Sequence, residues 1–250
     1  MTHELPAGTR PVAVVTGAGR GLGREISRQL AGRGMTVLAT TRDADRGRAA
    51  VAELLADGGD VRFARLDVTN ADDVREVADL VQRELGRVDL LINNAGVSGV
   101  ASGHRRGVDE VDVAELRATL DVNLVGVFAV TTALLPMLRR SGGRVVNLTS
   151  ALGTFGRVCA DIPPLRADLI PYCTSKAALN MVTVLWAGLL RGSGVRVYAV
   201  SPGYVATGMN NFAGTKTVEE GAAVVVRLAT AEAGALPERA FLTESGAISW

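Results

Sequence analysis

A phenol and an ammonium group spaced four residues apart have the clearest chemical potential in this chain. Tyr172 and Lys176 belong to the run Tyr-Cys-Thr-Ser-Lys. The Ala-Ala-Leu-Asn-Met-Val that follows Lys176 favours a helix. On a helix this spacing places both side chains on one face. A cation beside a tyrosine favours the phenolate and lowers the tyrosine pKa from its usual value of about 10. Such a group could donate a proton to a carbonyl oxygen, although the same spacing is common on solvated helix faces.

The composition of the chain limits the class of protein it can be. Its 250 residues, 48% hydrophobic and 21% charged, suit a domain with a sizeable buried core. A net charge of +1 and an aromatic content of 4% disfavour a nucleic-acid surface. Cys159 and Cys173 lack the spacing of metal ligands, so we expect reduced thiols and no metal site. Because we find neither a spanning apolar run nor a signal-like N-terminus, we expect a cytoplasmic protein without membrane contact.

Strand-like and helix-like segments alternate along the chain. Short runs rich in β-branched residues predict strands at 11–16, 36–41, 61–66, 88–92, 144–149, 195–200 and, as an edge strand, 240–243. Periodic apolar residues predict helices at 24–31, 44–56, 71–85, 113–140, 172–190 and 218–231. We expect the long helix to bend near Pro136. This order predicts an α/β fold, a doubly wound parallel sheet of about seven strands with helices on both faces.

We expect one domain over residues 1–250, without a linker or an internal repeat. Residues 1–10 should be a loose leader. Residues 153–171, which include Pro163 and Pro164, should form a long loop near the active site, because long loops in compact domains are usually functional or mobile.

A glycine-rich turn follows the first predicted strand. Gly17, Gly21 and Gly23 lie between that strand and the first helix. A turn without side chains lets the backbone approach a pyrophosphate, whose charge is stabilised at a helix N-terminus. The spacing differs from the common Gly-x-Gly-x-x-Gly pattern, and a plain strand-to-helix turn is the alternative. The position between a strand and a helix favours a nucleotide site.

Five motifs in order make the chain resemble a known family. They are Thr16-Gly-x-x-x-Gly-x-Gly23, Asn93-Asn-Ala-Gly96, Ser150 at a strand end, Tyr172-x-x-x-Lys176 and Pro202-Gly203. In this order they resemble the short-chain dehydrogenase/reductase family, from Val12 to about Thr243, and most closely its carbonyl-reductase branch. The resemblance implies a Rossmann-type fold and a nicotinamide cofactor.

The resemblance also implies roles for individual residues. Ser150 would hydrogen-bond the substrate carbonyl, Tyr172 would donate the proton, and Lys176 would lower the tyrosine pKa and bind the nicotinamide ribose. Asn123 would hold a water that links Lys176 to solvent. The cofactor would contact residues along the whole chain: Gly17, Arg20, Gly21, Leu22, Gly23, Thr41, Arg42, Asp67, Val68, Asn94, Ala95, Gly96, Tyr172, Lys176, Pro202, Gly203, Val205 and Thr207. Structural alternatives stay open. Asp67 could cap a helix, Asn123 could be a satisfied core amide, and Arg20 and Arg42 could be solvated surface charges. Ser150, Asn93-Asn94 and Pro202-Gly203 could be turn residues.

The cofactor preference follows from charge at the end of the second strand. A carboxylate there would bind the ribose diol and repel a 2′-phosphate. Thr41 occupies that position by resemblance, followed by Arg42, and Arg20 lies in the glycine turn. Two guanidinium groups would suit a phosphate, so we expect NADP(H). A small shift of the turn could instead offer Asp43 to the ribose of NAD.

The expected activity is an NADP(H)-dependent reduction of a ketone or aldehyde, reversible as alcohol oxidation. The alternatives are an NADP(H)-sensing protein without catalysis and an NAD-dependent alcohol dehydrogenase. The substrate is expected to be small and hydrophobic, because the candidate pocket residues are mostly apolar: Leu152, Phe155, Tyr204, Met209 and Phe212. The segment between Ser150 and Tyr172 is longer than usual for the family. The C-terminus lacks the family's common Asp-Gly-Gly, so the state of any homo-oligomer, dimer or tetramer, stays open.

Overall fold

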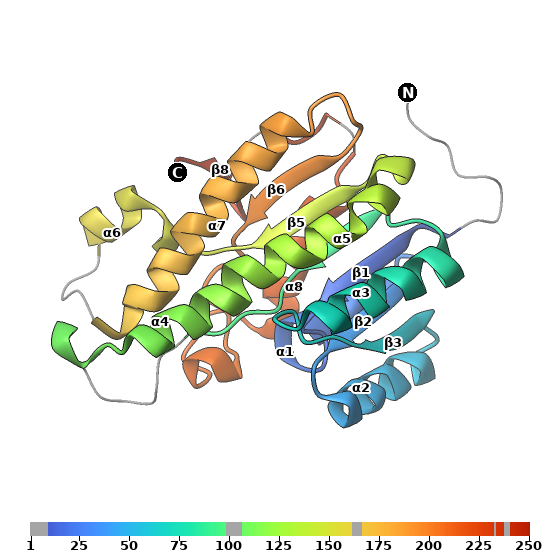
Figure 1. Ribbon diagram of the computed structural model, residues 1–250, viewed down its shortest axis with the longest axis horizontal. Coiled ribbons are helices and arrows are strands. Elements are labelled where there is room, and N and C mark those ends of the chain that lie inside the picture. The colour runs from blue at the N-terminus through green and yellow to red at the C-terminus, as the bar shows by residue number, and fades with distance from the viewer. Residues whose placement is uncertain (1–9, 99–106, 162–166, 233, 238–240) are drawn as a thin grey trace.

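A twisted sheet forms the middle layer of the protein in the computed structural model (Figure 1). The structure describes residues 10–98, 107–161, 167–232, 234–237 and 241–250. Eight strands lie in the order β3-β2-β1-β4-β5-β6-β7-β8, and all neighbours are parallel except β7 and β8. Their bounds are β1 Val12–Thr16, β2 Thr36–Thr41, β3 Val61–Arg65, β4 Leu90–Asn93, β5 Arg144–Leu148, β6 Arg196–Val200, β7 Phe241–Thr243 and β8 Gly246–Ile248.

Helices cover both faces of this sheet (Figure 1). Their bounds are α1 Gly21–Ala31, α2 Ala44–Ala56, α3 Ala71–Leu80, α4 Val113–Leu120, α5 Gly126–Ser141, α6 Phe155–Asp161, α7 Ile170–Leu189 and α8 Val218–Ala229. On one face α1 and α8 bury Ile26, Leu30 and Val225 against the strands. On the other face α3 and α5 bury Val77 and Leu134. The expected doubly wound α/β fold is therefore confirmed.

The chain order reverses direction in the sheet between β1 and β4. From β1 the chain goes outward to β2 and β3, and then returns to place β4 on the other side of β1. In such sheets ligands lie beyond the carboxyl ends of the strands at this reversal. The glycine turn after β1 and the Asn-Asn-Ala-Gly segment after β4 both lie there.

Several elements differ from the sequence-based expectation. An eighth strand, β8, pairs antiparallel with β7, and its three residues are too short to give a strand signal. The predicted long loop at 153–171 contains the short helix α6, and α7 begins at Ile170. The expected helix at 113–140 is interrupted by a π-helical turn at Asp121–Val125. The expected leader, apart from Arg10, and residues 162–166 of the loop lie outside the described residues.

The long helical stretch Val113–Ser141 is unusually apolar. By length and composition alone it could cross a membrane, with a mean hydropathy of 1.7 in its most apolar window. Only 39% of that window is buried in the protein. Val113, Val125 and Phe128 are exposed on this stretch, and α7 beside it (Figure 1) exposes Met181, Leu185 and Leu189.

Candidate active site

The glycines of the turn after β1 meet two different structural requirements, close packing and a left-handed backbone. A Cβ on Gly17 would lie 2.9 Å from Ala95 Cα, and one on Gly23 would lie 2.4 Å from Asn94 Nδ2. These two glycines permit close packing between the turn and the segment after β4. Gly21 meets no atom within 4 Å, but its φ of 52° is in the left-handed region that favours glycine. The turn therefore exposes bare backbone at the start of α1.

The N-terminus of α1 is suited to an anion. Among the described residues, no side chain caps this end, and the first turn of α1 contains no acidic residue. The first N–H groups of a helix lack partners within the helix, and its dipole favours negative charge there. These backbone groups fit a cofactor pyrophosphate.

Hydrogen bonds of Thr16 link the segment after β4 to the end of β1. Its hydroxyl oxygen accepts hydrogen bonds from the backbone N–H groups of Asn94 and Ala95, both at 3.0 Å. The Asn94 amide donates to the Thr16 carbonyl oxygen at 2.8 Å. These bonds show turn chemistry for Asn94, and they hold Ala95 and Gly96 at the carboxyl edge of the sheet.

Asn93 has a different role from its neighbour. Its side chain is buried and donates to Thr131 Oγ1 on α5 at 3.0 Å and to Asn147 Oδ1 on β5 at 2.8 Å. Within the described chain, its Oδ1 atom has no hydrogen-bond partner. Asn93 thus ties the sheet to α5 and faces away from the edge where Asn94 lies.

The end of β2 carries the residues expected to choose the cofactor. Thr41 ends the strand, and its side chain lies 3.1 Å from the position that a Cβ of Gly19 would take. Asp43 caps α2 by accepting from Arg46 N at 3.0 Å, and it also pairs with the Arg46 guanidinium at 3.4 Å. The Asp43 carboxylate is therefore already engaged.

Arg20 and Arg42 have different neighbours in this structure. Arg20 Nη1 lies 4.0 Å from the position of a Cβ on Gly208, in the loop after β6. Hydrogen bonds from Thr69 lower the pKa of Asp67, and the positive charge of Arg42 adds to this lowering. Both arginine side chains are exposed, and their convergence on a phosphate stays a prediction.

Asp67 follows β3 and is fixed by local hydrogen bonds. Its Oδ1 accepts from the Thr69 backbone N–H at 3.0 Å and from the Thr69 hydroxyl at 2.7 Å. The cap of α3 is a different residue, Asn70, which accepts from Asp72 N and Asp73 N. The helix-cap alternative for Asp67 is thus wrong, and Val68 beside it is buried against Gly126.

Ser150 and Tyr172 come together at the carboxyl end of β5. Ser150 is the second residue after that strand, and its hydroxyl oxygen accepts from Leu152 N at 3.2 Å. Burial raises the pKa of Tyr172, and the Ser150 side chain only partly offsets that rise. The phenol is thus held protonated.

Lys176 lies on the same helix face as Tyr172, as the spacing predicts. Its ammonium nitrogen is 5.7 Å from the centre of the Tyr172 ring and donates to the Leu148 carbonyl oxygen at 2.8 Å. Burial lowers the pKa of Lys176 to about 8. The pKa of Tyr172 is raised, where the sequence led us to expect a lowered value, because burial of the phenol is the largest influence on it.

Asn123 lies in the π-helical turn between α4 and α5. Its Oδ1 accepts from Val97 N at 2.9 Å, and its Nδ2 donates to Val97 O at 2.8 Å and to Ser175 Oγ at 3.0 Å. A π-helical turn redirects side chains and is frequent at functional sites. The amide is satisfied, as the structural alternative requires, and it also borders the site.

The loop after β6 is held by a residue that the sequence analysis did not single out. Asn210 Nδ2 donates to Val205 O at 2.9 Å, and Asn210 Oδ1 accepts from Thr207 N at 3.1 Å. This clasp fixes Val205 and Thr207 next to Pro202 and Gly203. The residue pair Asn210-Asn211 is a turn signal that could have indicated it.

The candidate substrate residues are mostly exposed. Phe155, Tyr204, Met209 and Phe212 are all exposed, and Leu152 is partly buried. Met209 O accepts from Ser98 Oγ at 3.3 Å, so the loop after β6 contacts the segment after β4. Phe212 has a φ of 61°, which is uncommon for an aromatic residue and often marks a functional loop.

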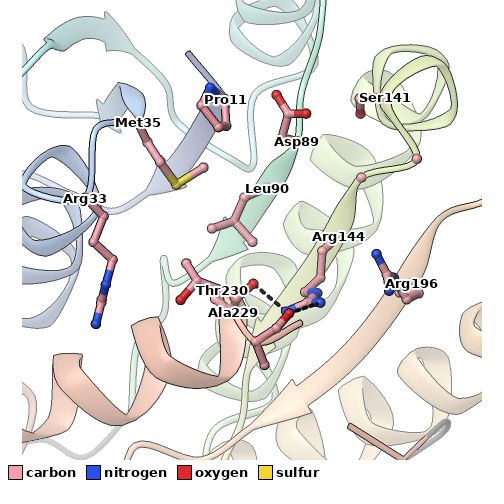
Figure 2. A pocket seen from close by; sticks show the side chains of 13 residues that line it. Pro11, Arg33, Met35, Asp89, Leu90, Ser141, Arg144, Arg196, Ala229 and Thr230 are labelled. Atoms are coloured by element: carbon pink, nitrogen blue, oxygen red, sulfur yellow. Dashed lines mark hydrogen bonds between the residues drawn. The ribbon is translucent and has the colours of Figure 1, made fainter. Parts of the chain in front are cut away.

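A cavity of about 430 Å³ lies at the opposite edge of the sheet, at the amino ends of the strands. Arg144 in this cavity donates to the Leu228, Ala229 and Ala231 carbonyl oxygens at the end of α8, as Figure 2 shows in part. A cation there stabilises the negative end of a helix. This cavity has a structural arginine and is remote from Ser150 and Tyr172.

Among the described residues, no group of His, Cys, Asp and Glu side chains is placed to hold a metal ion.

Comparison with known proteins identifies the family. Residues 11–218 match the family model described as short chain dehydrogenase. Short-chain dehydrogenase/reductase 1 of Saponaria officinalis is 33% identical, over 93% of this chain and 94% of that protein. NADPH-bound carbonyl reductase from chicken fatty liver has a TM-score of 0.84 at 25% identity, covering 97% of this chain and 100% of that one. A metagenomic short-chain oxidoreductase in complex with NADP has a TM-score of 0.76 at 31% identity, covering 93% and 96%.

The chain therefore belongs to the short-chain dehydrogenase family of oxidoreductases. The family assignment made from the five motifs is confirmed. Enzymes of this family use nicotinamide cofactors on small-molecule substrates, and the bare helix end and the glycine turn described above fit such a cofactor.

Proposed function

We propose that this protein is an NADP(H)-dependent reductase of apolar ketones or aldehydes. The observation that carries the proposal is the Ser150 side chain acting on the buried phenol of Tyr172, whose pKa it lowers, with Lys176 buried on the same face of α7. These groups converge beyond the carboxyl end of β5, next to the glycine turn and the segment after β4. This is where a doubly wound sheet binds its ligands.

In the proposed mechanism, Ser150 and Tyr172 both donate hydrogen bonds to the substrate carbonyl oxygen. Donors that are already oriented stabilise the negative charge that develops on this oxygen. A reduced nicotinamide, when bound, would supply the hydride to the carbonyl carbon. Tyr172 then delivers its proton to the oxygen, and its raised pKa keeps that proton in place until charge develops.

Lys176 has two expected tasks in this mechanism. Its ammonium group would bind the nicotinamide ribose, and its charge would stabilise the phenolate that Tyr172 becomes after proton transfer. Its pKa of about 8 places its own titration near neutral pH. Asn123 and Val97 border the same region, because a Cβ added to the neighbouring Gly96 would lie 3.8 Å from Lys176 Nζ.

Several observations support NADP(H) over NAD(H). The last residue of β2 is Thr41, which cannot repel a 2′-phosphate. Asp43 is engaged by Arg46 and the start of α2. Arg42 is exposed and not held in an ion pair among the described residues, so its guanidinium could bind a phosphate. The two solved relatives described above were crystallised with NADPH and NADP.

We infer the substrate class from the exposed apolar residues on the segments that follow β5 and β6. Phe155, Met209 and Phe212 expose apolar side chains there. Apolar surfaces of this kind bind apolar ligands, with a few polar groups that fix their orientation. We therefore propose a hydrophobic ketone or aldehyde, with Ser150 and Tyr172 as the polar groups.

A homo-oligomer is the partner that the surface favours. Val125 and Phe128 on the π-helical turn and α5, with Met181, Leu185 and Leu189 on α7, form an exposed apolar face. Phe128 packs against Trp186 with ring centres 5.1 Å apart, so the two helices form one continuous surface. Exposed apolar patches of this kind mark interaction sites.

Analytical ultracentrifugation of the wild type and of Leu185→Lys tests whether the protein forms a homo-oligomer through this face. A monomeric wild type would reject the proposed homo-oligomer. The cytoplasmic location stays a prediction.

Transfer of deuterium tests the proposed reaction. The protein is incubated with a hydrophobic aryl ketone and NADPH deuterated at C4 of the nicotinamide. We expect deuterium on the carbinol carbon of the product, in one stereochemical form. If a broad set of apolar ketones and aldehydes gives no labelled alcohol, the proposed function is wrong.

A further inference from the structure

Ser175 joins the catalytic helix to the π-helical turn. It is fully buried, and in the sequence of α7 it lies between Tyr172 and Lys176. Its hydroxyl donates to the Tyr172 carbonyl oxygen at 2.7 Å and accepts from Asn123 Nδ2 at 3.0 Å. A hydroxyl group that donates to one partner and accepts from another fixes the orientation of both.

The orientation of the Asn123 amide determines where Val97 lies. Asn123 Oδ1 accepts from Val97 N, and Asn123 Nδ2 donates to Val97 O, in a two-bond clamp on one peptide segment. Because Ser175 accepts the second hydrogen of the same Nδ2, only one orientation of the amide satisfies all three bonds. Ser175 thereby holds the segment after β4 in register with α7.

Gly96 shows that this register matters for the site. A Cβ on Gly96 would lie 3.2 Å from Asn123 Oδ1 and 3.8 Å from Lys176 Nζ. These two polar atoms therefore border the same narrow space. A rotation of the Asn123 amide would move Val97 and Gly96 relative to the Lys176 ammonium group.

We propose that Ser175 is a positioning residue, which acts through Asn123 to fix the Ala95–Val97 segment relative to Tyr172 and Lys176. The catalytic consequence rests on the proposed function, because this segment and Lys176 are where the cofactor ribose is expected. The positional consequence, the clamp on Val97, does not depend on that function.

Thr183 offers a matched control on the same helix. It is buried, it accepts from Asn147 Nδ2 at 2.9 Å, and it donates to the Leu179 carbonyl oxygen at 2.7 Å. This is the same chain of asparagine amide, hydroxyl and helix carbonyl. It holds β5 and makes no contact with the Val97 clamp.

The test compares Ser175→Ala with Thr183→Val in two measurements. Hydrogen exchange by NMR follows the Val97 amide, and steady-state kinetics follow ketone reduction. We expect both variants to lose a similar few degrees of melting temperature, because each leaves a buried asparagine amide with one bond fewer. Only Ser175→Ala should speed exchange at Val97, by about 10-fold or more beyond the change in global stability.

The kinetic result should separate the two variants in the same way. A displacement of catalytic groups by about 1 Å can cost about 100-fold in rate, so we expect Ser175→Ala to lower kcat by about 10- to 100-fold. The ketone KM should change little, since Ser175 is fully buried while most candidate substrate residues are exposed. Thr183→Val should keep a kcat near that of the wild type.

Two results would overturn the proposal. One is unchanged Val97 exchange in Ser175→Ala, and the other is equal acceleration in both variants. If the wild type reduces no ketone while Val97 exchange still responds only to Ser175→Ala, the proposed function fails and the positioning role stands.

Discussion

Lys176 Nζ donates a hydrogen bond to the carbonyl oxygen of Leu148, the last residue of β5, across 2.8 Å. This bond ties the catalytic helix α7 to the strand that Ser150 follows. It also holds the ammonium group 5.7 Å from the Tyr172 ring centre in a buried position. The charged form of the lysine is thus maintained by one carbonyl oxygen at a cost in desolvation, which lowers its pKa to about 8.

This burial predicts a pH dependence of stability. Above pH 8, folded Lys176 loses its proton, while in the unfolded chain it keeps the proton up to the ordinary value of 10.5. The unfolded state then binds more protons, so this lysine makes the free energy of unfolding rise with pH in that window. From about pH 7.5 to about pH 9.5 the rise should be about 2 kcal/mol. Tyr172, whose pKa is raised, opposes this trend only above pH 10.

Urea unfolding of the wild type and of Lys176→Met across this window measures the effect. Lys176→Met should lack the rise, and Lys216→Met, which removes a lysine paired with Glu244 near the surface, should keep it. Equal pH dependence in the wild type and Lys176→Met would contradict the account of a desolvated ammonium group.

The glycine turn predicts a loss of stability that depends on position. In Gly23→Ala the new methyl group would meet Asn94 Nδ2 at 2.4 Å and Gly17 O at 2.5 Å. Overpacking of this kind costs about 1–3 kcal/mol, and it should also weaken NADPH binding because it moves the turn. In Gly156→Ala the methyl group meets nothing within 4 Å in α6. Chemical denaturation should show the loss in the first variant and little change or a gain in the second.

The arginines that follow β2 predict how substitutions there would change the cofactor preference. Arg42→Ala should weaken NADPH binding by about 10- to 100-fold, because a hydrogen-bonded charge pair with the phosphate is lost. NADH binding should change little. Arg46→Ala is the control, since the Arg46 guanidinium pairs with Asp43.

Thermal melting with each cofactor reads out this preference. A ligand that binds only the folded protein adds about 2.7 kcal/mol at a hundredfold excess over Kd. We expect a larger shift of the wild type with NADPH than with NADH, and a reduced NADPH shift in Arg42→Ala. A wild type that responds more strongly to NADH would reject the NADP(H) preference and point to Asp43 or the turn as the ribose contact.

The sequence was sufficient for the order of elements and for the groups that meet on one helix. Buried strands such as Val12–Thr16 carry continuous β-branched residues, and the spacing of Tyr172 and Lys176 sets their common face by helix geometry alone. The weaker elements could not be predicted in this way. β8 has three residues and owes its pairing to β7, and the π-helical turn at Asp121–Val125 has no periodic signal.

The electrostatics of the site depended on contacts that a linear pattern does not contain. The expectation that Lys176 lowers the Tyr172 pKa assumed two neighbouring groups in a solvent-like medium. In the fold the phenol is buried and the ammonium group binds Leu148, so burial dominates both pKa values. Asn210 and Ser175 were missed because their roles rest on contacts with Val205 and Asn123, and the contact between Ser175 and Asn123 spans 52 positions.

Turnover of the wild type and of Tyr172→Phe with NADPH and a hydrophobic ketone tests the central claim most directly. The substitution removes one hydroxyl group, so melting temperature and the shift caused by NADPH should stay close to those of the wild type. The account predicts a loss of about 100- to 10,000-fold in kcat, the contribution of a general acid. Near-normal turnover by Tyr172→Phe would contradict the assignment of Tyr172 as the proton donor.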